Sequence, residues 1–541
     1  MRVTILDGYV DEPSNLGVPP FISPYPRYLA GAVLESGHEY EYLTIDQVRG
    51  GKRPRGDLLA VISGPIVPGK YLRGMPMSQR EILQQVSSFN GTKILGGSLA
   101  RFRAYDGGLE KAFDHVAVRD LDACVFDFLN GGDFKDRDRS IKEWDRWAAS
   151  GAEVVKSHPD FPEPLVAELD ASRGCVRYMT GGCSFCIEPM YGIPKFRTAV
   201  GIREEVRRLS SLGVVNFRLG GMADFFSYMA KGVGESPTPT PNVRALDDLL
   251  RGIRSAAPNL KVLHTDNADP AMIVAHPDQA MAALRLLVKY TTPGNTLSLG
   301  MESADPDVVE RNNLNSTPET SLKAVTMINS VGAERGENGL PRLLPGLNFV
   351  LGLDGETQNT FFLNLKFLRT LLDRDLMVRR INIRQVNPVR RDFDMKYRNL
   401  FRSFKDHVRL EIDHEMLKRV VPRGTVLRYV RTEMREGKMT FGRQAGTYPL
   451  LVGLPYHLEL ARSIDVMVTD HGQRSITAVE HPLDVNSAPM AALSAIPGIG
   501  KKRAARIVRS RPMKGPKDLH ACLDDDSAAA SAEAYLGFPS G

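Results

Sequence analysis

The chain has 541 residues, which is too long for one compact core and predicts three or four domains at about 150 residues each. Apolar residues make up 42% and charged residues 25%, so the composition excludes a disordered or fibrous protein. The formal net charge of +6 is small for this length and does not by itself indicate nucleic acid, a membrane surface or acidic substrates.

No stretch approaches the roughly 18 consecutive apolar residues of a membrane span. The first residues lead into an apolar strand without a signal-peptide pattern, so we expect no membrane association and a cytoplasmic location. Five cysteines occur, and three fall within twelve residues, which suits a metal or cluster site better than a disulfide framework. Cys124 and Cys522 are expected to be ordinary thiols.

Residues 1–160 alternate short apolar segments with segments of helical spacing. This alternation predicts a doubly wound α/β domain with a binding crevice at the carboxyl ends of its strands. The third and fourth predicted strands end in small residues, namely Ser63, Gly64, Gly96, Gly97 and Ser98. The predicted strands are Val3–Leu6, Tyr40–Ile45, Leu58–Ser63, Lys93–Leu95 and Val116–Val118.

A glycine-rich segment from Gly64 to Lys70 has the spacing of a phosphate-binding loop. Pro65 and Pro68 lack the N–H groups that such a loop must direct at phosphate. Tyr71 stands where a serine or threonine would bind Mg²⁺. We therefore reject the phosphate-loop interpretation.

Residues 161–405 resume the alternation with six strand–helix repeats, which predict a partial (β/α)6 barrel. Residues 406–482 change to alternating strands and predict a small β-rich module. Residues 483–522 contain two short amphipathic segments around a glycine-rich hairpin, and we expect the Ala/Ser-rich end, 523–541, to be disordered. The predicted barrel strands are Val166–Leu169, Val214–Leu219, Lys261–His264, Thr296–Leu299, Leu347–Leu351 and Ile381–Val386.

Cys175, Cys183 and Cys186 follow the first predicted barrel strand with the spacing C-x7-C-x2-C. Three thiolates fill three irons of a cubane [4Fe–4S] cluster and leave the fourth iron open. S-adenosylmethionine (SAM) suits that iron, because its amine and carboxylate can chelate it. A structural zinc ion needs four protein ligands, and no fourth Cys or His lies nearby, so zinc is the weaker alternative.

With these cysteines, the segment resembles the radical SAM superfamily, whose usual spacing is C-x3-C-x2-C. The last pair fits, with the aromatic Phe185 between its cysteines, while the seven-residue first gap departs from the pattern. The resemblance implies a [4Fe–4S] cluster with SAM on the open iron. It also implies SAM contacts at the glycine pair after the second strand, at a carboxylate, at a later glycine turn and at the aromatic residue: Gly220, Gly221, Glu302, Gly352 and Phe185.

The N-terminal domain resembles the cobalamin-binding domain that precedes the barrel in many radical SAM enzymes. The resemblance implies that Ser63, Gly64, Gly96, Gly97 and Ser98 let a corrin ring lie over the sheet edge. No Asp-x-His-x-x-Gly sequence occurs in this region, so the cobalamin would have no histidine ligand from the protein. A scaffold without cobalamin is the alternative.

Residues 496–503 resemble a helix-hairpin-helix motif, whose N–H groups and neighbouring cations, here Lys501, Lys502 and Arg503, grip a phosphate in nucleic-acid-binding proteins. Packing of two helices onto a neighbouring domain explains the motif equally well. The order of the four parts resembles an archaeal group of radical SAM proteins with this C-terminal motif.

That group includes the glutamine C-methyltransferase of methyl-coenzyme M reductase. The resemblance therefore implies methylation of an unactivated carbon, with a protein substrate, the α-subunit of that reductase, and an electron donor such as a ferredoxin or flavodoxin. The alternative is a methylating or methylthiolating enzyme acting on tRNA. The hairpin and the β-rich module favour this alternative, whereas the lack of a second set of cysteines near the N-terminus disfavours it.

Overall fold

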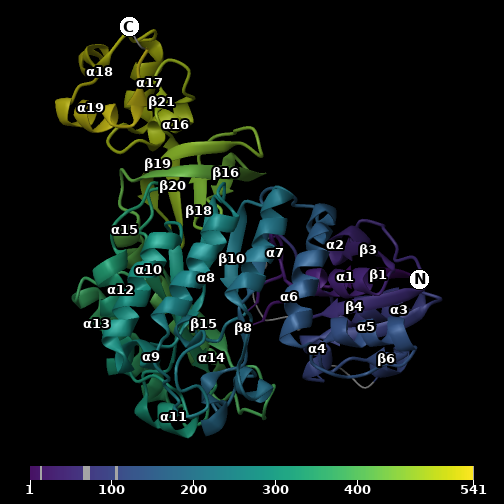
Figure 1. Cartoon of the computed structure of the whole chain (residues 1–541). Coiled ribbons are helices and arrows are strands. Elements are labelled where there is room, and N and C mark those ends of the chain that lie inside the picture. The colour runs from purple at the N-terminus through teal and green to yellow at the C-terminus, as the bar shows by residue number, and fades with distance from the viewer. Residues whose placement is uncertain (13–14, 65–72, 104–107, 540–541) are drawn as a thin grey trace. The chain divides into compact units, whose positions relative to one another are not determined.

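The computed structural model describes residues 1–12, 15–64, 73–103 and 108–539 (Figure 1). The rejected phosphate loop falls mostly on residues 65–71, outside these ranges. The chain forms two compact units. The first contains Met1–Thr291, Glu310–Ser316 and Val386–Phe393, and the second contains Thr292–Val309, Thr317–Gln385 and Asp394–Gly541.

The first unit begins with a parallel five-stranded sheet in the order β3-β1-β4-β5-β6. Its central strand β4 (Leu58–Ser63) is buried at every position, as expected for a parallel strand covered on both faces. The predicted parallel α/β sheet is therefore present at the expected segments. The other strands are β1 (Arg2–Asp7), β3 (Glu39–Thr44), β5 (Thr92–Gly97) and β6 (His115–Val116), and the helices include α1 (Tyr25–Glu35), α3 (Gln79–Ser87), α4 (Ser98–Arg101) and α5 (Leu121–Gly131).

Helix α6 (Ile141–Ser150) shows how local sequence fixes an element of this unit. The Ser140 hydroxyl accepts a hydrogen bond from the Glu143 N–H, and the Glu143 carboxylate accepts one from the Ser140 N–H, so a capping box begins the helix. Trp144 and Trp147 lie on its buried face. Helix α6 packs against α1 through this face.

A second parallel sheet in the first unit has the order β11-β10-β7-β2. Strand β2 (Phe21–Ile22) comes from the N-terminal region and pairs with β7. This pairing was not predicted, because two residues are too few to show strand periodicity. The predicted boundary near residue 160 is therefore crossed by a shared sheet. The other strands are β7 (Val166–Asp170), β10 (Asn216–Gly220) and β11 (Val262–Thr265), with helices α7 (Ala199–Ser211), α8 (Val243–Ala256), α9 (Pro270–Ala275) and α10 (Pro277–Tyr290).

The second unit holds three parallel strands, β13 (Asn295–Glu302), β14 (Leu343–Leu351) and β15 (Arg380–Gln385). Helices α12 (Pro318–Gly332) and α13 (Gln358–Asp373) alternate with them. The six predicted barrel strands are thus all present, three in each unit.

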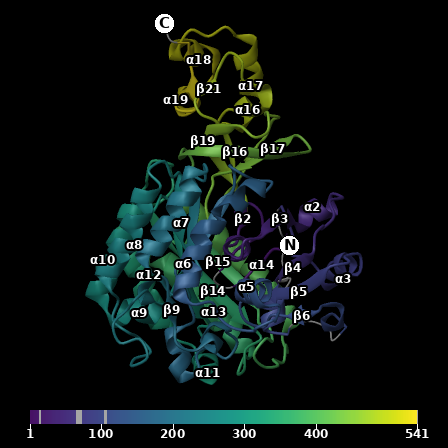
Figure 2. The same ribbon diagram turned by 45° about the vertical axis from the view of Figure 1, so that its right-hand side comes forward.

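The β-rich module of the second unit is a closed barrel with the strand order β16-β17-β18-β20-β19. Figure 2 shows the C-terminal helices beside this barrel. One hydrophobic core contains buried residues of both, including Val430, Val466, Leu493 and Ile507. The barrel strands are β16 (Val426–Glu436), β17 (Met439–Arg443), β18 (Leu451–Leu454), β19 (Ser463–His471) and β20 (Ser475–Glu480), and the helices are α16 (Met490–Ala495), α17 (Gly500–Arg509), α18 (Pro516–Cys522) and α19 (Asp526–Glu533).

The expected disordered end, 523–541, is ordered over most of its described length. Helix α19 presents Ala529 and Ala532 to the core, and β22 (Leu536–Gly537) pairs with β21 (Leu483–Asp484). The expectation was wrong because an alanine-rich helix can pack closely through one small-residue face. No helix within the described ranges has the length and apolar character needed to cross a bilayer.

Candidate functional site

The three cysteines lie in one loop of the first unit, after β7 and the short strand β8 (Ser172–Arg173). A single 3-10 helix, Val176–Thr180, occupies most of the long first gap. Gly181 and Gly182 then adopt φ angles of +80° and +61°, which reverse the chain before Cys183. The unusual seven-residue gap is therefore one tight turn and a reversal. We call residues 174–187 the cysteine loop.

The three cysteine thiols are close enough for the charge on one to raise the pKa of another. Burial raises the pKa of the Cys175 thiol to about 12, and burial together with Cys183 and Cys175 raises the pKa of Cys186. The metal-free thiols of Cys175 and Cys186 are thus protonated at neutral pH, and iron would displace their protons. No three His, Cys, Asp or Glu side chains of the described ranges surround a single metal-ion position. A cubane cluster places a different demand on the loop, since each cysteine binds its own iron.

Arg177 and Asn313 hold the turn between the first two cysteines. Arg177 is only 6% exposed, and its Nη1 donates to Sγ of Cys183 at 3.3 Å, while its Nη2 donates to Oδ1 of Asn313 at 2.8 Å. The Asn313 amide donates in turn to the carbonyl oxygens of Thr180 and Gly182. Nε of Arg177 is buried and has no acceptor among the residues that the structure describes.

Arg390 stabilises the cysteine loop through hydrogen bonds to its backbone. Its Nη1 donates to the carbonyl oxygens of Gly181, Cys183 and Cys186 at 3.0, 2.8 and 3.3 Å. Sequence reasoning missed Asn313 and Arg390, because each is more than 100 residues from the loop and no motif connects them. The donor set is compatible with an iron–sulfur cluster: three cysteines lie in one short loop, close enough for their charges to interact, and the buried Nε–H of Arg177 has no acceptor among the described residues, a role that an inorganic sulfide could fill.

Two carboxyl groups, the buried Asp224 and the half-buried Asp269, follow β10 and β11. The Asp269 N–H donates to Oδ1 of Asp224 at 2.8 Å. Burial raises the pKa of both groups, and Asp269 raises that of Asp224 further. Asp269 also raises the pKa of Cys175, which places it near the cysteine loop. Sequence reasoning missed this pair, although an acidic residue soon after a strand of a parallel sheet is a usable signal.

Gly220 and Gly221 lie at the end of β10, as predicted. Gly221 has φ +62°, and a Cβ on it would lie 2.1 Å from Oδ1 of Asp170. A carboxylate of the chain itself therefore explains why Gly221 is glycine. The contacts of this pair and of the half-buried Phe185 with SAM stay predictions.

Glu302 ends β13 in the second unit in a strained conformation. The strand register shifts between Gly300 and Glu302, and Glu302 adopts φ +63°. A non-glycine residue in this region costs about 1–3 kcal/mol and is typical of functional sites. Burial raises the Glu302 pKa to about 8, and Arg384 opposes this shift. Oε2 of Glu302 is buried and, within the described ranges, has no hydrogen-bond partner.

The sheet that carries Glu302 has one apolar and one polar face. Parallel sheets usually bury apolar side chains on both faces, so this polar face is an exception, and part of it contacts Tyr448 of the same unit. Asn382 donates to Asn348 at 3.2 Å on this face, and the Arg380 guanidinium lies 4.2 Å from the ring centre of Tyr448. The apolar face carries Leu297, Leu299, Leu347, Phe349, Ile381 and Ile383, and the polar face carries Ser298, Asn348, Arg380, Asn382 and Arg384.

Gly352, the predicted adenine neighbour, follows β14 with φ +91°. Its N–H donates to Oε2 of Glu356 at 2.7 Å. The turn after β14 is therefore held by a carboxylate of the chain itself, and the contact of Gly352 with adenine stays a prediction.

A pocket lies at the carboxyl edge of the five-stranded sheet in the first unit. Its volume is about 460 Å³, including its opening to solvent, and no histidine is among the described residues that line it. Two residues predicted to contact cobalamin, Gly97 and Ser98, line this pocket. The remaining lining residues are Glu12, Tyr25, Leu29, Ile62, Arg101, Arg119, Asp120, Leu121, Asp122, Arg139, Arg173 and Tyr191.

The other three residues predicted to contact cobalamin do not line the pocket. Ser63 is fully buried and donates to the carbonyl oxygen of Gly96 at 2.7 Å. A Cβ on Gly96 would lie 2.6 Å from the Leu121 side chain, and one on Gly64 would lie 2.8 Å from the carbonyl oxygen of Tyr9. These small residues make room for the chain's own packing, and their contact with a corrin stays a prediction.

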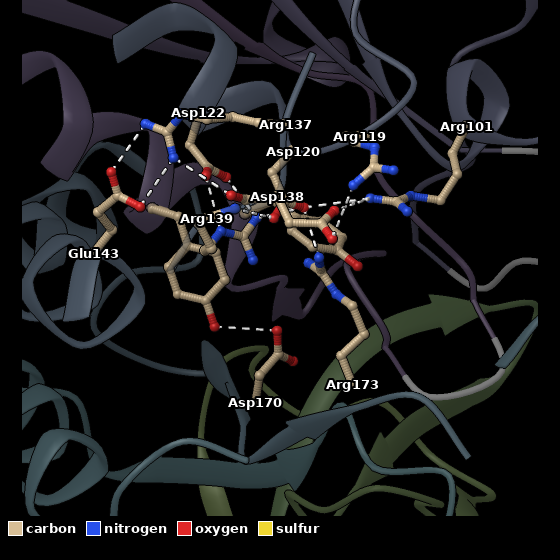
Figure 3. Close-up of polar contacts among 12 residues, drawn as sticks. Arg101, Arg119, Asp120, Asp122, Arg137, Asp138, Arg139, Glu143, Asp170 and Arg173 are labelled. Atoms are coloured by element: carbon tan, nitrogen blue, oxygen red, sulfur yellow. Dashed lines mark hydrogen bonds and ion pairs between the residues drawn. The ribbon is translucent and has the colours of Figure 1, made fainter. Parts of the chain in front are cut away.

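A buried ion-pair network forms one wall of the pocket (Figure 3). Asp120 receives Arg101, Arg139 and Arg173 at 3.4, 3.3 and 2.7 Å. Burial raises the pKa of Asp120, but the three guanidinium groups outweigh burial and hold it well below its usual range. Arg139 also binds Asp122 at 2.6 Å. Nη1 of Arg139, a residue 4% exposed, is buried without an acceptor in the described part of the chain.

Two residues that line the pocket, Arg173 and Tyr191, flank the cysteine loop in the sequence. Arg173, two residues before Cys175, donates to Asp120, and its guanidinium lies 5.3 Å from the ring centre of Tyr191. Burial raises the pKa of Glu12, across the pocket, to about 7, although Tyr25 donates to it at 2.8 Å. The N–H groups of the arginines that line the pocket, including the Arg139 Nη1 that lacks a described acceptor, are suitable donors for the amide oxygens at the rim of a corrin.

The fold and the site define an α/β protein with a three-cysteine loop at the carboxyl end of a parallel sheet. No family model matches the chain. It is 44% identical over 504 residues to uncharacterized protein MJ0274 of Methanocaldococcus jannaschii, covering 88% of this chain and 92% of that protein. It is 40% identical over 538 residues to an uncharacterized protein of Archaeoglobus fulgidus, covering 96% of this chain and 97% of that protein. The chain belongs to the family of these two archaeal proteins.

One solved structure with a similar arrangement is that of the cobalamin-dependent S-adenosylmethionine radical enzyme OxsB with aqua-cobalamin bound. The TM-score is 0.46 and the sequence identity 14%. The similarity covers 75% of this chain, which spans 55% of the OxsB chain.

Glu302 should make the stability of the protein depend on pH. Because its folded pKa of about 8 lies above its value of about 4.5 in the unfolded chain, the native state holds the extra proton between these pH values. Stability from this group is therefore present at low pH and lost as pH rises toward 8. We expect the melting temperature of the wild type, relative to E302Q, to fall between pH 5 and 8.5. E436Q, which alters an exposed glutamate, is the control, and parallel pH profiles for the wild type and E302Q would contradict the assignment.

Proposed function

We propose that this chain is a radical SAM enzyme in which Cys175, Cys183 and Cys186 hold a [4Fe–4S] cluster. The observation that carries the proposal is the cysteine loop, which brings three cysteines within electrostatic range of one another and holds Nε of Arg177 buried without a described acceptor. A cluster of this kind, with SAM on its open iron, supplies one-electron cleavage of SAM to methionine and a 5′-deoxyadenosyl radical.

The residues of the chain supply binding and orientation in this proposal. Arg390 and Asn313 fix the backbone of the cysteine loop before any cluster arrives, so little reorganisation is needed. Glu302 offers an unpartnered buried oxygen to an ammonium or hydroxyl group of SAM. The polar face of β13, β14 and β15 would orient the substrate through Asn348, Asn382 and their neighbours.

We further propose that the reaction is C-methylation of an unactivated carbon with cobalamin. Methylcobalamin would supply a methyl group to a carbon radical, which the electrophilic methyl of SAM cannot do. The pocket beside the cysteine loop supports this proposal. The small residues Gly97 and Ser98 line it, and Arg139 offers an N–H without a described acceptor. Our specific proposal for the substrate is a glutamine α-carbon in the α-subunit of methyl-coenzyme M reductase, with a ferredoxin or flavodoxin as electron donor.

A tRNA-modifying enzyme is the second candidate, and the closed β-barrel of the second unit favours it. The hairpin between α16 and α17 favours it less than the sequence indicated. Arg503 binds Asp524 and Asp525 at 2.9 and 3.0 Å, and Arg506 binds Asp524 at 2.9 Å. Two cations near the hairpin are therefore already paired, which leaves less positive charge for a phosphate backbone.

The cluster proposal predicts the iron content and activity of anaerobically reconstituted protein. We expect about four irons and four sulfides per chain and formation of 5′-deoxyadenosine from SAM with a reductant. Replacement of Cys175, Cys183 and Cys186 together by alanine should abolish both. C522A removes a cysteine outside the cysteine loop and should change neither. Deoxyadenosine formation by the triple variant would refute the proposal.

The cobalamin proposal predicts stoichiometric binding of hydroxocobalamin, with a spectrum that lacks an imidazole ligand from the protein. Arg101 lines the pocket, so R101Q should weaken binding about tenfold through loss of one charged hydrogen bond. R146Q, which removes an exposed arginine paired with Glu35, is the matched control. Equal affinities of R101Q and R146Q would show that cobalamin does not bind in this pocket. Failure of the wild type to bind hydroxocobalamin would contradict a cobalamin-dependent reaction.

The substrate proposal predicts transfer of one methyl group to a peptide. Incubation with SAM, cobalamin, a reductant and a glutamine-containing peptide of the reductase α-subunit should add the mass of one methylene at the glutamine α-carbon. Bulk tRNA should be unmodified in the same assay. Binding to tRNA should be weak and fall steeply with salt, as expected of a few exposed cations. A modified nucleoside together with an unchanged peptide would favour the second candidate.

A further inference from the structure

Arg177 is a buried cation within the cysteine loop and donates to a cysteine sulfur. Its guanidinium is anchored on one side by Asn313, 2.8 Å away, and reaches Sγ of Cys183, 3.3 Å away, on the other. The residue is 6% exposed, so it cannot turn toward water without disturbing the loop. Its charge also acts on the nearby Asp269, whose pKa it lowers against the effect of burial. The guanidinium is thus held in one orientation from two sides.

The contact with Cys183 changes in character when the cysteine binds iron. The Sγ atom of the free thiol then becomes a thiolate, and a hydrogen bond from a guanidinium to an anionic acceptor is stronger than one to a neutral acceptor. Nε of Arg177 is buried and lacks an acceptor in the described residues. An inorganic sulfide beside Cys183 would give this N–H an acceptor. The free protein therefore already contains one donor aimed at a cluster ligand and a second donor without a partner.

We propose that Arg177 raises the reduction potential of the cluster by donating to the Cys183 sulfur and by placing a fixed positive charge beside it. This inference rests on the proposed function. Reduction adds one electron to the cluster, and a hydrogen-bond donor and a positive charge both stabilise the reduced form more than the oxidised form. Hydrogen bonds to the sulfurs and the net charge are two of the factors that set such potentials.

Arg390 has a different task at the same loop. It donates to three carbonyl oxygens and to no sulfur in the described structure. Its hydrogen bonds fix the backbone positions from which Cys183 and Cys186 reach their irons. Arg390 is therefore a positioning residue for cluster retention, whereas Arg177 acts on the electron affinity of the cluster. Variants of the two arginines can therefore separate an effect on cluster retention from an effect on the reduction potential.

The test is an EPR-monitored redox titration of reconstituted protein, with iron and sulfide measured on the same samples. We expect R177Q to lower the potential so that the ratio of reduced to oxidised cluster falls at least tenfold at a fixed potential, which is 59 mV for one electron. R177K keeps the charge without the planar fork and should give a smaller decrease. R390Q should hold less iron but keep the wild-type potential in the clusters that remain. R208Q, at an exposed helix position, is the control for charge number and should match the wild type.

A second variant covers the case in which R177Q retains no cluster. N313A removes the anchor of Nη2 and leaves the guanidinium in place, so it should lower the potential by less than R177Q. Wild-type potentials in N313A and R177K, with full iron content, would overturn the inference and leave the cluster proposal intact. A wild-type protein that binds no iron would overturn the proposed function itself, and the iron assay separates these two outcomes.

Discussion

A buried carboxylate with three guanidinium partners joins the pocket of the first unit to its cysteine loop. Asp120 accepts from Arg101, Arg139 and Arg173, and Arg173 stands two residues before Cys175. Loss of one partner of a buried charge typically costs about 3–5 kcal/mol, because the remaining charge cannot reach water. The start of the cysteine loop is therefore tied to the N-terminal sheet. A ligand in the pocket would therefore lie against the same ion-pair network that holds the start of the cysteine loop.

The end of the cysteine loop is fixed by residues from distant parts of the chain. Arg390 binds three of its carbonyl oxygens, and Asn313 binds two more at its turn. A loop with two αL glycines would otherwise have many accessible conformations, and ordering its backbone costs about 1–2 kcal/mol per residue. Because this entropy is lost on folding, iron binding need not offset it. The chain thus prepares the loop, and the thiols need only lose their protons when iron binds.

The sequence alone predicted the cysteine loop and the strands but not the residues that hold the loop. Cys175, Cys183 and Cys186 carry a spacing that can be read locally, whereas Arg390 meets them only after the fold forms. The structure gives Gly96 a packing role that no local pattern reveals, since the space of its missing Cβ is filled by Leu121. Composition failed at the C-terminal end for a similar reason. Ala529 and Ala532 become core residues because the fold supplies a surface for them.

Features that break local rules occur where the proposed chemistry needs them. Glu302 has a strained backbone and an unpartnered buried oxygen, the Arg177 Nε lacks a described acceptor, and the sheet β13, β14 and β15 is polar on one face. Each feature costs free energy in the ligand-free chain, and none improves packing. Folding alone would not favour such groups, whereas hydrogen bonds to a bound ligand would offset their free-energy cost. These exceptions are therefore candidate positions for the binding of SAM, a cluster and a polar substrate.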